Sequence, residues 1–320
     1  MLSQLRHDFF HKRWKHQPGV VPWLLARPTI FFLALMRLMP SRLVLALADG
    51  LGRVAWLSRR RRLIGRDHLQ QAMPALTASA RDALLKTSCG HLGRAAVETM
   101  IVLDRLRANS DSAKPSGEAL LPRIAFEPGS RELLEAQLGQ GTVFIGAHLG
   151  AFEVMGAVAG VLGLHPAFPM RFPNNHYLGQ SLLRGRHGWG NQLIPRKGAV
   201  RKMVAHLAKG HCVMLATDQS AHHRPLGVTW FGREAPTERA AAQMAIRLGK
   251  PLVVVWCTRT ERHGYWRVGA EQVEAAGERR EASGAAVLDL CERTHRALER
   301  AILTAPEQYL WIHDRFRITK

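Results

Sequence analysis

Short apolar runs alternate with helix-forming segments through the second half of this chain. The runs are rich in Val, Ile, Leu, Phe and Met, and they cover residues 142–147, 167–170, 211–216 and 252–257. Segments rich in helix formers lie at residues 130–138, 151–164, 200–209, 237–248 and 283–303. Strands that alternate with helices predict an α/β fold, in which a central, mainly parallel sheet is flanked by helices.

A functional side chain stands at the end of each of the four apolar runs. These side chains are His148, Arg171, Asp218 and Arg259. Ligands of open α/β sheets bind beyond the carboxyl ends of the strands, so we expect the four groups to share one site. Any one of them is equally compatible with a solvated surface residue, and their shared position is what favours a site. Arg171 and Arg259 are candidates for binding phosphate or steering a donor, and Asp218 for binding substrate, organising its turn or pairing with an arginine.

The first of these runs carries a histidine and, five positions later, a carboxylate. The spacing suits His148 in a strand-to-helix turn and Glu153 in the first turn of the following helix, where a carboxylate is favoured. Glu153 would accept a proton from one imidazole nitrogen, leaving the other as a general base. A lone His–Glu pair is common by chance. A metal site needs more ligands, and because no HExxH or CxxC pattern accompanies the pair, we predict no metal.

Several segments match, in order, the motifs of one enzyme family. His148 and Glu153 fit an H-x4-D/E box, and the other matching segments are MRFPNN at 170–175, RGRHG at 184–188, TDQ at 217–219, FGREAPT at 231–237 and PEQYLWIHDRF at 306–316. Together they resemble the bacterial lipid A biosynthesis acyltransferases, the lauroyl and myristoyl transferases of the glycerolipid acyltransferase superfamily. The resemblance covers most of the chain from about Arg53 onward.

The resemblance implies transfer of a fatty acyl chain from an acyl carrier protein to a hydroxyl of a phosphorylated, lipid A-type lipid, with no cofactor. His148 would be the general base, and the matched motifs add Asn174 and Arg186 to the substrate-binding residues Arg171, Asp218 and Arg259. One alternative is acylation of another glycolipid or phospholipid from acyl-CoA. Another is a non-catalytic basic protein that binds membrane or nucleic acid.

The charge of the chain calls for a polyanionic partner. Lys and Arg number 45 against 25 Asp and Glu, which gives a net charge of +20. No helix-turn-helix, zinc-finger or RNA-binding pattern is visible, so we expect no nucleic acid. An anionic membrane, a phosphorylated lipid and an acidic carrier protein explain the charge equally well. The four cysteines are far apart and form no CxxC pair, which favours a reducing compartment.

The N-terminal part predicts a helical, membrane-associating region. Residues 20–57 are apolar and have basic residues on both flanks, at positions 6, 12, 13 and 15 and at 59–62. Pro22, Arg27 and Pro28 interrupt the run, so we expect no helix that spans the bilayer. Residues 41–57 instead suggest an amphipathic helix in the membrane interface, with Arg42, Asp49 and Arg53 on its polar side; a helical hairpin packed on the core is the alternative.

These patterns divide the chain into a membrane-associating region, residues 1–62, and an acyltransferase α/β domain, residues 63–320. They place the protein at the cytoplasmic face of the inner membrane. The attachment expected there is peripheral or monotopic, or a single N-terminal anchor.

Overall fold

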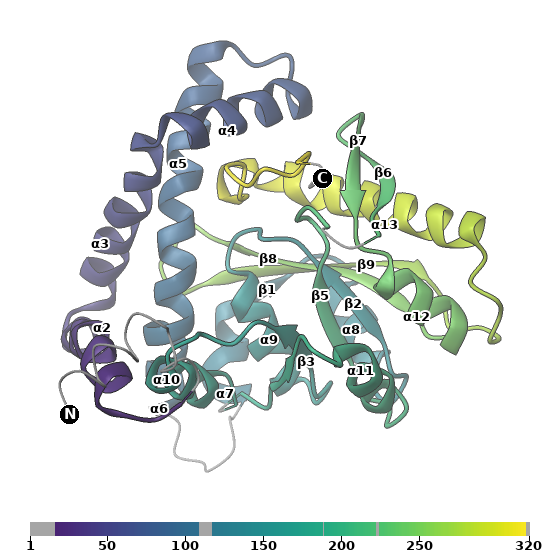
Figure 1. The fold of residues 1–320 in the computed structure, drawn as a ribbon, viewed down its shortest axis with the longest axis horizontal. Helices are drawn as coiled ribbons and strands as arrows, with labels where there is room; N and C mark the ends of the chain where they lie inside the picture. Colours follow the sequence, from purple (N-terminus) through teal and green to yellow (C-terminus); the bar gives the residue numbers. More distant parts are fainter. Residues whose placement is uncertain (1–16, 109–116, 188, 222–223, 318–320) are drawn as a thin grey trace, which may run out of the picture.

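The fold is built on one seven-stranded, mostly parallel sheet with helices on both faces (Figure 1). The computed structural model describes residues 17–108, 117–187, 189–221 and 224–317. β8 and β9 pair antiparallel and β1 is parallel to β9, while the remaining neighbours are parallel. In spatial order the strands are β1 (Ile124–Phe126), β9 (Trp266–Glu274), β8 (Leu252–Arg259), β2 (Val143–Gly146), β5 (Val213–Ala216), β3 (Ala167–Met170) and β4 (Gln192–Pro195). The predicted α/β class is confirmed.

The elements expected from the sequence are present, and others join them. The five expected helices correspond to α8 (Ser130–Glu135), α9 (Phe152–Val161), α11 (Ala199–Leu207), α12 (Ala240–Leu248) and α13 (Gly284–Thr304). Strands β1, β4 and β9 were not predicted, nor was the hairpin of β6 (Leu226–Trp230) and β7 (Arg233–Thr237). Strand β7 of that hairpin ends at Thr237, the residue at which the helix 237–248 was expected to begin.

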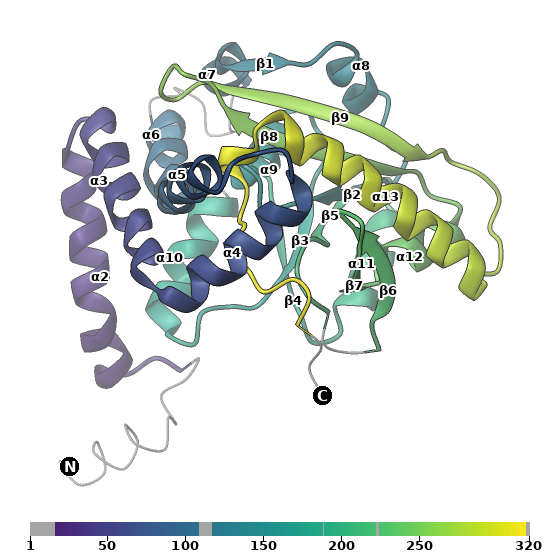
Figure 2. The same cartoon turned by 90° about the horizontal axis from the view of Figure 1, so that it is seen from above.

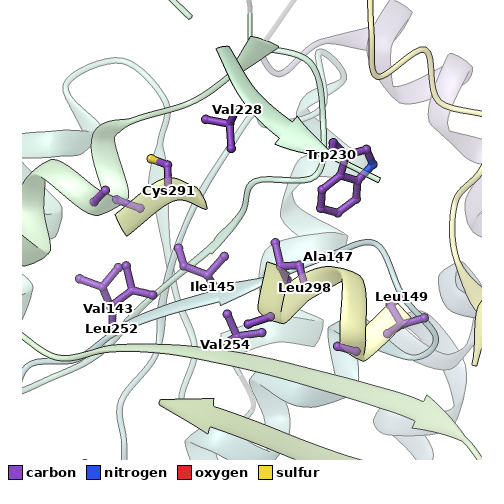
Figure 3. Packing of buried hydrophobic residues seen from close by; sticks show 14 of the residues in the cluster. Val143, Ile145, Ala147, Leu149, Val228, Trp230, Leu252, Val254, Cys291 and Leu298 are labelled. Carbon is purple, nitrogen blue, oxygen red and sulfur yellow. The ribbon is translucent and has the colours of Figure 1, made fainter. Parts of the chain in front are cut away.

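The central strand β2 is buried on both faces, as expected for an inner strand of a parallel sheet. Val143 and Ile145 belong to one apolar cluster, and Phe144 belongs to the other. Helix α13 covers the first cluster, where its Leu298 lies over the strands (Figure 3). Helix α9 contributes Val154 to the second. All four cysteines are buried and unpaired.

Helices from the first third of the chain form a layer beside the sheet, with α2 and α3 at its outer side (Figure 2). The elements are α2 (Val20–Leu38), α3 (Ser41–Arg53), η1 (Val54–Leu57), α4 (Arg59–Ala72), α5 (Ala78–Val97), η2 (Glu98–Val102) and α6 (Leu103–Ala108). Short segments α7 (Gly117–Leu120) and η3 (Leu121–Arg123) lead into β1, α10 (His176–His187) precedes β4, and η4 (Pro306–Gln308) follows α13.

The expectation that Pro22, Arg27 and Pro28 interrupt the first apolar run is wrong. α2 is one continuous helix of 19 residues, and by length and composition alone it could cross a membrane. Pro22 lies in its first turn, where the missing N–H has no helical partner to lose. Pro28 lies inside the helix. The Arg27 guanidinium lies over the Trp23 ring, 4.1 Å from its centroid, within the continuous helix. The basic residues at positions 6 to 15 lie outside the described residues.

Helix α3 packs against α5 with almost no side chain between the two backbones. A Cβ atom at Gly52 would lie 2.3 Å from the Cys89 carbonyl oxygen, and one at Gly93 would lie 2.0 Å from that of Ala48. Any larger residue would therefore force the helices apart. Because of this packing, Asp49 is buried and pairs with Arg94 at 2.9 Å, which corrects its expected place on the polar outer side.

The outer side of α3 is instead apolar. Leu43, Leu47 and Leu51, spaced one turn apart, are each more than two-fifths exposed. The boundary expected between residues 62 and 63 falls inside α4, so the two-part division of the chain stays a prediction.

Candidate active site

The turn between β2 and α9 presents His148 at the carboxyl edge of the sheet, where the sequence predicted it. The turn is pinned to the C-terminal segment: Gly150 N–H donates to the Gln308 carbonyl at 2.9 Å, and Leu310 N–H donates to the His148 carbonyl at 3.2 Å. Gly150 has φ of +56°, and a Cβ atom there would lie 2.4 Å from the Cys257 carbonyl oxygen. Glycine at position 150 thus lets the turn lie against β8.

Asp218 is the carboxylate that holds the imidazole. One of its oxygens lies 2.9 Å from His148 Nδ1, and the other accepts the His148 backbone N–H at 2.9 Å. Asp218 is 1% exposed. Burial alone would raise its pKa, but the His148 charge, the hydrogen bonds from His148 and the charge of Arg315 outweigh burial and lower that pKa. An ionised Asp218 accepts at both oxygens, so Nδ1 carries the proton and Nε2 keeps its lone pair.

The register of two neighbouring strands explains this pair. β2 and β5 are adjacent and parallel, with Gly146 opposite Ala216. His148 and Asp218 each lie two residues beyond that last pair, so their side chains meet at the same edge. Asp218 thus contacts the histidine, which the sequence analysis did not predict, and its expected role in substrate binding stays a prediction.

Glu153 lies in the first turn of α9, as predicted, but Asp218 rather than Glu153 occupies Nδ1 of His148. Burial disfavours the imidazolium, yet the charge and hydrogen bond of Asp218, together with the charge of Glu153, raise the His148 pKa above its usual value. Glu153 therefore acts on the imidazole through its charge. The expectation that Glu153 orients the ring is corrected at Nδ1 by the register of β2 and β5.

The other ring nitrogen faces a side chain that the sequence analysis did not assign. Gln219 Nε2 lies 3.3 Å from His148 Nε2, so the amide can donate to the lone pair of the base. The side chain of Gln219 is exposed, whereas its backbone carbonyl accepts from Arg315 at 3.1 Å. Arg315 thus holds the backbone of the Asp218–Gln219 turn, while the side-chain amide of Gln219 stays exposed.

Arg315 is a buried cation beneath this turn, and the sequence analysis missed its role. It is 2% exposed, and its guanidinium donates to Thr237 Oγ1 at 2.6 Å and to the Pro236 carbonyl. It also lies 3.2 Å from Nε2 of His295, whose pKa is lowered to about 4 by burial and by the charge of Arg315. Burial and the charge of Asp218 raise the pKa of Tyr309. In the sequence, only the motif at residues 306–316 indicated these contacts. This segment contacts His148 through the Leu310 N–H.

Three further residues, Arg171, Asn174 and Arg186, were expected to bind substrate. Arg171 follows β3 at the same edge and is exposed. Asn174 is partly buried, whereas its neighbour Asn175 caps α10 by accepting from the Tyr177 N–H at 3.0 Å. Arg186 belongs to α10, but its side chain lies outside the described residues. No contact with a substrate tests these three assignments, which stay predictions.

Arg259 lies at the end of β8, but its guanidinium is not free to bind phosphate or to steer a donor as was expected. Its guanidinium makes a buried ion pair with Glu98, at 2.6 and 2.9 Å, and its side chain is 7% exposed. The partner charge neutralises Arg259 inside the protein, and this arrangement suits a link between β8 and the N-terminal helical layer better than a phosphate ligand.

An apolar cavity of about 170 Å³ is lined in part by Phe152 and Glu153. The ring of Phe152 lies 5.0 Å from that of His148, centroid to centroid, and Phe152 also lines the cavity. Its other walls come from β2, β3, β5 and α9, with Glu153, Phe168, Met170, Met214 and Leu215 among them. Within the described ranges, no group of three or more His, Cys, Asp or Glu side chains could hold a metal ion.

Comparison with known proteins identifies the family of this chain. The sequence model of a family described as bacterial lipid A biosynthesis acyltransferase matches residues 10–318. The chain belongs to this family. It is 26% identical over 267 residues to a lipid A biosynthesis palmitoleoyltransferase of Escherichia coli (strain K12) and, equally, to a lipid A biosynthesis acyltransferase of Shigella flexneri. Each match covers 81% of this chain and 79% of the relative. The protein is therefore an acyltransferase, as the resemblance of its motifs implied.

Proposed function

We propose that this acyltransferase moves a fatty acyl chain from the thioester of an acyl carrier protein to a hydroxyl of a phosphorylated, lipid A-type lipid. The family and the names of the two relatives support the lipid A-type acceptor. The observation that carries the chemistry is the His148–Asp218 pair, in which Nδ1 is held by a buried carboxylate and Nε2 is left as a base. This arrangement is the one that acyl-transfer enzymes use to activate a hydroxyl.

In the proposed reaction, Nε2 of His148 takes the proton of the acceptor hydroxyl as its oxygen attacks the thioester carbon. The C–S bond breaks, the sulfur leaves as a thiolate, and the imidazolium returns the proton to it. The charges of Asp218 and Glu153 stabilise the imidazolium while it exists, in line with the raised pKa of His148. The acceptor hydroxyl would replace the Gln219 amide next to Nε2. The scheme needs no metal and no cofactor.

The apolar cavity is where we place the first part of the acyl chain. Two of its lining residues, Phe152 and Glu153, follow His148 in the sequence and lie against the imidazole or act on it through charge. Burying methylene groups there is favourable by about 0.8 kcal/mol each. A thioester at the mouth of the cavity would then lie within reach of a hydroxyl bound at Nε2.

The direct test combines purified protein, an acyl carrier thioester and a phosphorylated disaccharide lipid. We expect the mass of the lipid to rise by one fatty acid less one water, with release of one thiol per acylated product. A sample without lipid controls for thioester hydrolysis. Transfer only from acyl-CoA, or only to glycerophospholipid, would replace this proposal with the alternative acceptor or donor, and no transfer at all would reject it.

We also propose that the protein lies on the cytoplasmic face of the inner membrane through the outer faces of α2 and α3. Along α2, Phe31 is 71% and Leu38 is 85% exposed. Both ends of α2 are tied to the rest of the protein: Asn175 Nδ2 donates to the Pro22 carbonyl at 2.7 Å, and Arg105 donates to the Met36 carbonyl at 3.0 Å. A helix held at both ends by one folded body fits the plane of the interface better than a path across it.

Single cysteines at the two flanks of this region test the arrangement. Because the four native cysteines are buried, the variants Leu5→Cys and Arg59→Cys should label with little background. In sealed vesicles of known orientation, we expect both sites to react with a membrane-impermeant reagent from the cytoplasmic side. Labelling of the two sites from opposite sides would show that α2 spans the bilayer.

A further inference from the structure

A cluster of unneutralised cations borders the active-site edge of the sheet. Arg171 follows β3, Arg196 and Lys197 follow β4, and Arg201 and Lys202 lie in the first turns of α11; we call these five residues the α11 patch. All five are exposed. Elsewhere on the surface, arginines such as Arg131 and Arg293 pair with carboxylates. In the part of the chain that the structure describes, no carboxylate pairs with any residue of the α11 patch.

Two residues of the α11 patch, Arg201 and Lys202, are unfavourable for the stability of helix α11. The N-terminal end of a helix carries a partial positive charge, so cations there are unfavourable and acidic residues are favoured. The first turn of α11 has no acidic residue, and Arg201 and Lys202 lie near that end. Val200, between the cations, is 52% exposed. The cations of the patch repel one another, and Val200 exposes an apolar side chain to solvent. Such a surface is better suited to binding a partner than to contact with solvent.

The patch contacts a residue that lines the apolar cavity. The Arg196 N–H donates to the Met170 carbonyl at 3.2 Å, and Met170 lines the cavity. Arg171 is the next residue after Met170. Anything that rests on the α11 patch is thus placed beside the cavity that Phe152 and Glu153 line.

The patch lies away from the surface that we assign to the membrane. In both views α11 is on the far side of α10 and β3 from α2 and α3 (Figures 1 and 2). The exposed side chains of α2 and α3 are largely apolar, whereas the α11 patch is basic. Two surfaces of different chemistry, separated in this way, favour two different partners.

We infer that the α11 patch docks the acidic carrier protein that brings the acyl thioester. This inference rests on the proposed function and adds to it the surface through which the donor is recognised. Acidic side chains of the carrier would neutralise the patch and pack on Val200, while the flexible arm that bears the thioester passes Met170 into the cavity. Electrostatic complementarity of this kind accelerates association and depends on salt.

The test compares two donors with the same acyl chain, one attached to the carrier protein and one to free pantetheine. In the double variant Arg201→Glu/Lys202→Glu, we expect kcat/KM for the carrier-bound donor to fall on the order of tenfold or more. The rate with acyl-pantetheine should stay at the wild-type value, because that donor lacks the acidic surface. The salt dependence of the carrier reaction should also weaken, since fewer opposite charges meet.

A matched control separates docking from net charge. Lys86→Glu/Arg279→Glu makes the same change in charge at two exposed residues outside the α11 patch and should leave both donors unaffected. Equal losses with both donors, an unchanged carrier reaction, or a loss that appears only as reduced binding to anionic vesicles would each overturn the docking inference. If the wild-type protein used neither donor, the proposed function itself would fail.

Discussion

Replacing His148 by alanine is expected to lower the rate of acyl transfer by roughly 10²–10⁴, the usual contribution of a general base. The effect should fall on kcat rather than on the KM of either substrate, because Nε2 acts on the proton that moves during the reaction. The fold should persist, since the turn that carries His148 is also held by the backbone bonds of Gly150 and Leu310.

The exposed His263 offers a matched control. His263→Ala should transfer acyl groups at the wild-type rate and melt at the same temperature as His148→Ala to within a few degrees. Near wild-type transfer by purified His148→Ala would show that another group accepts the proton.

Asp218→Asn should produce a loss of comparable size, for a reason that the hydrogen bonds make explicit. His148 presents two donors to Asp218, its backbone N–H and its Nδ1–H, and each carboxylate oxygen accepts one. Asparagine has one oxygen and one amino group, so it can accept only one of the two donors. Either the buried N–H loses its partner, or Nδ1 becomes an acceptor and the proton moves to Nε2, where it abolishes the base.

Glu153→Gln serves as the comparison for this prediction. Glu153 acts on His148 through charge, whereas Asp218 adds direct hydrogen bonds, so we expect a clearly smaller loss of kcat for Glu153→Gln. Steady-state kinetics with thermal melting of both variants is the measurement. A greater loss in Glu153→Gln than in Asp218→Asn, at equal stability, would restore Glu153 as the group that orients the imidazole.

The sequence predicted the strand ends that carry His148, Arg171 and Asp218, because buried parallel strands are near-continuous apolar runs. It could not reveal which strands are neighbours. The contact of His148 with Asp218 depends on β5 lying next to β2, although β3 and β4 come between them in the sequence. Glu153, which is close in sequence, was therefore assigned the contact that a residue 70 positions away makes.

The missed elements lacked the patterns on which the prediction depended. β9 carries Arg267, Glu271 and Glu274, and β4 is a four-residue segment that ends in Pro195, so neither forms an apolar run. The partner of Arg259 was equally hidden, since Glu98 comes from a helical segment that only the fold brings to β8. In α2, prolines were taken as breaks although Pro22 lies in the first turn, where proline is tolerated.

The pH dependence of kcat/KM tests the central claim most directly, because it reports the ionisation of the base in the free enzyme. His148 must be neutral to accept a proton, and its pKa is raised by Asp218 and Glu153 despite burial. The activity should therefore fall on the acid side with a midpoint above the ordinary histidine value of about 6.5. Removing either negative charge, in Asp218→Asn or Glu153→Gln, should move that midpoint to lower pH. A profile with no acid limb, or one whose midpoint is the same in the wild type and both variants, would contradict the assignment of His148 as the base.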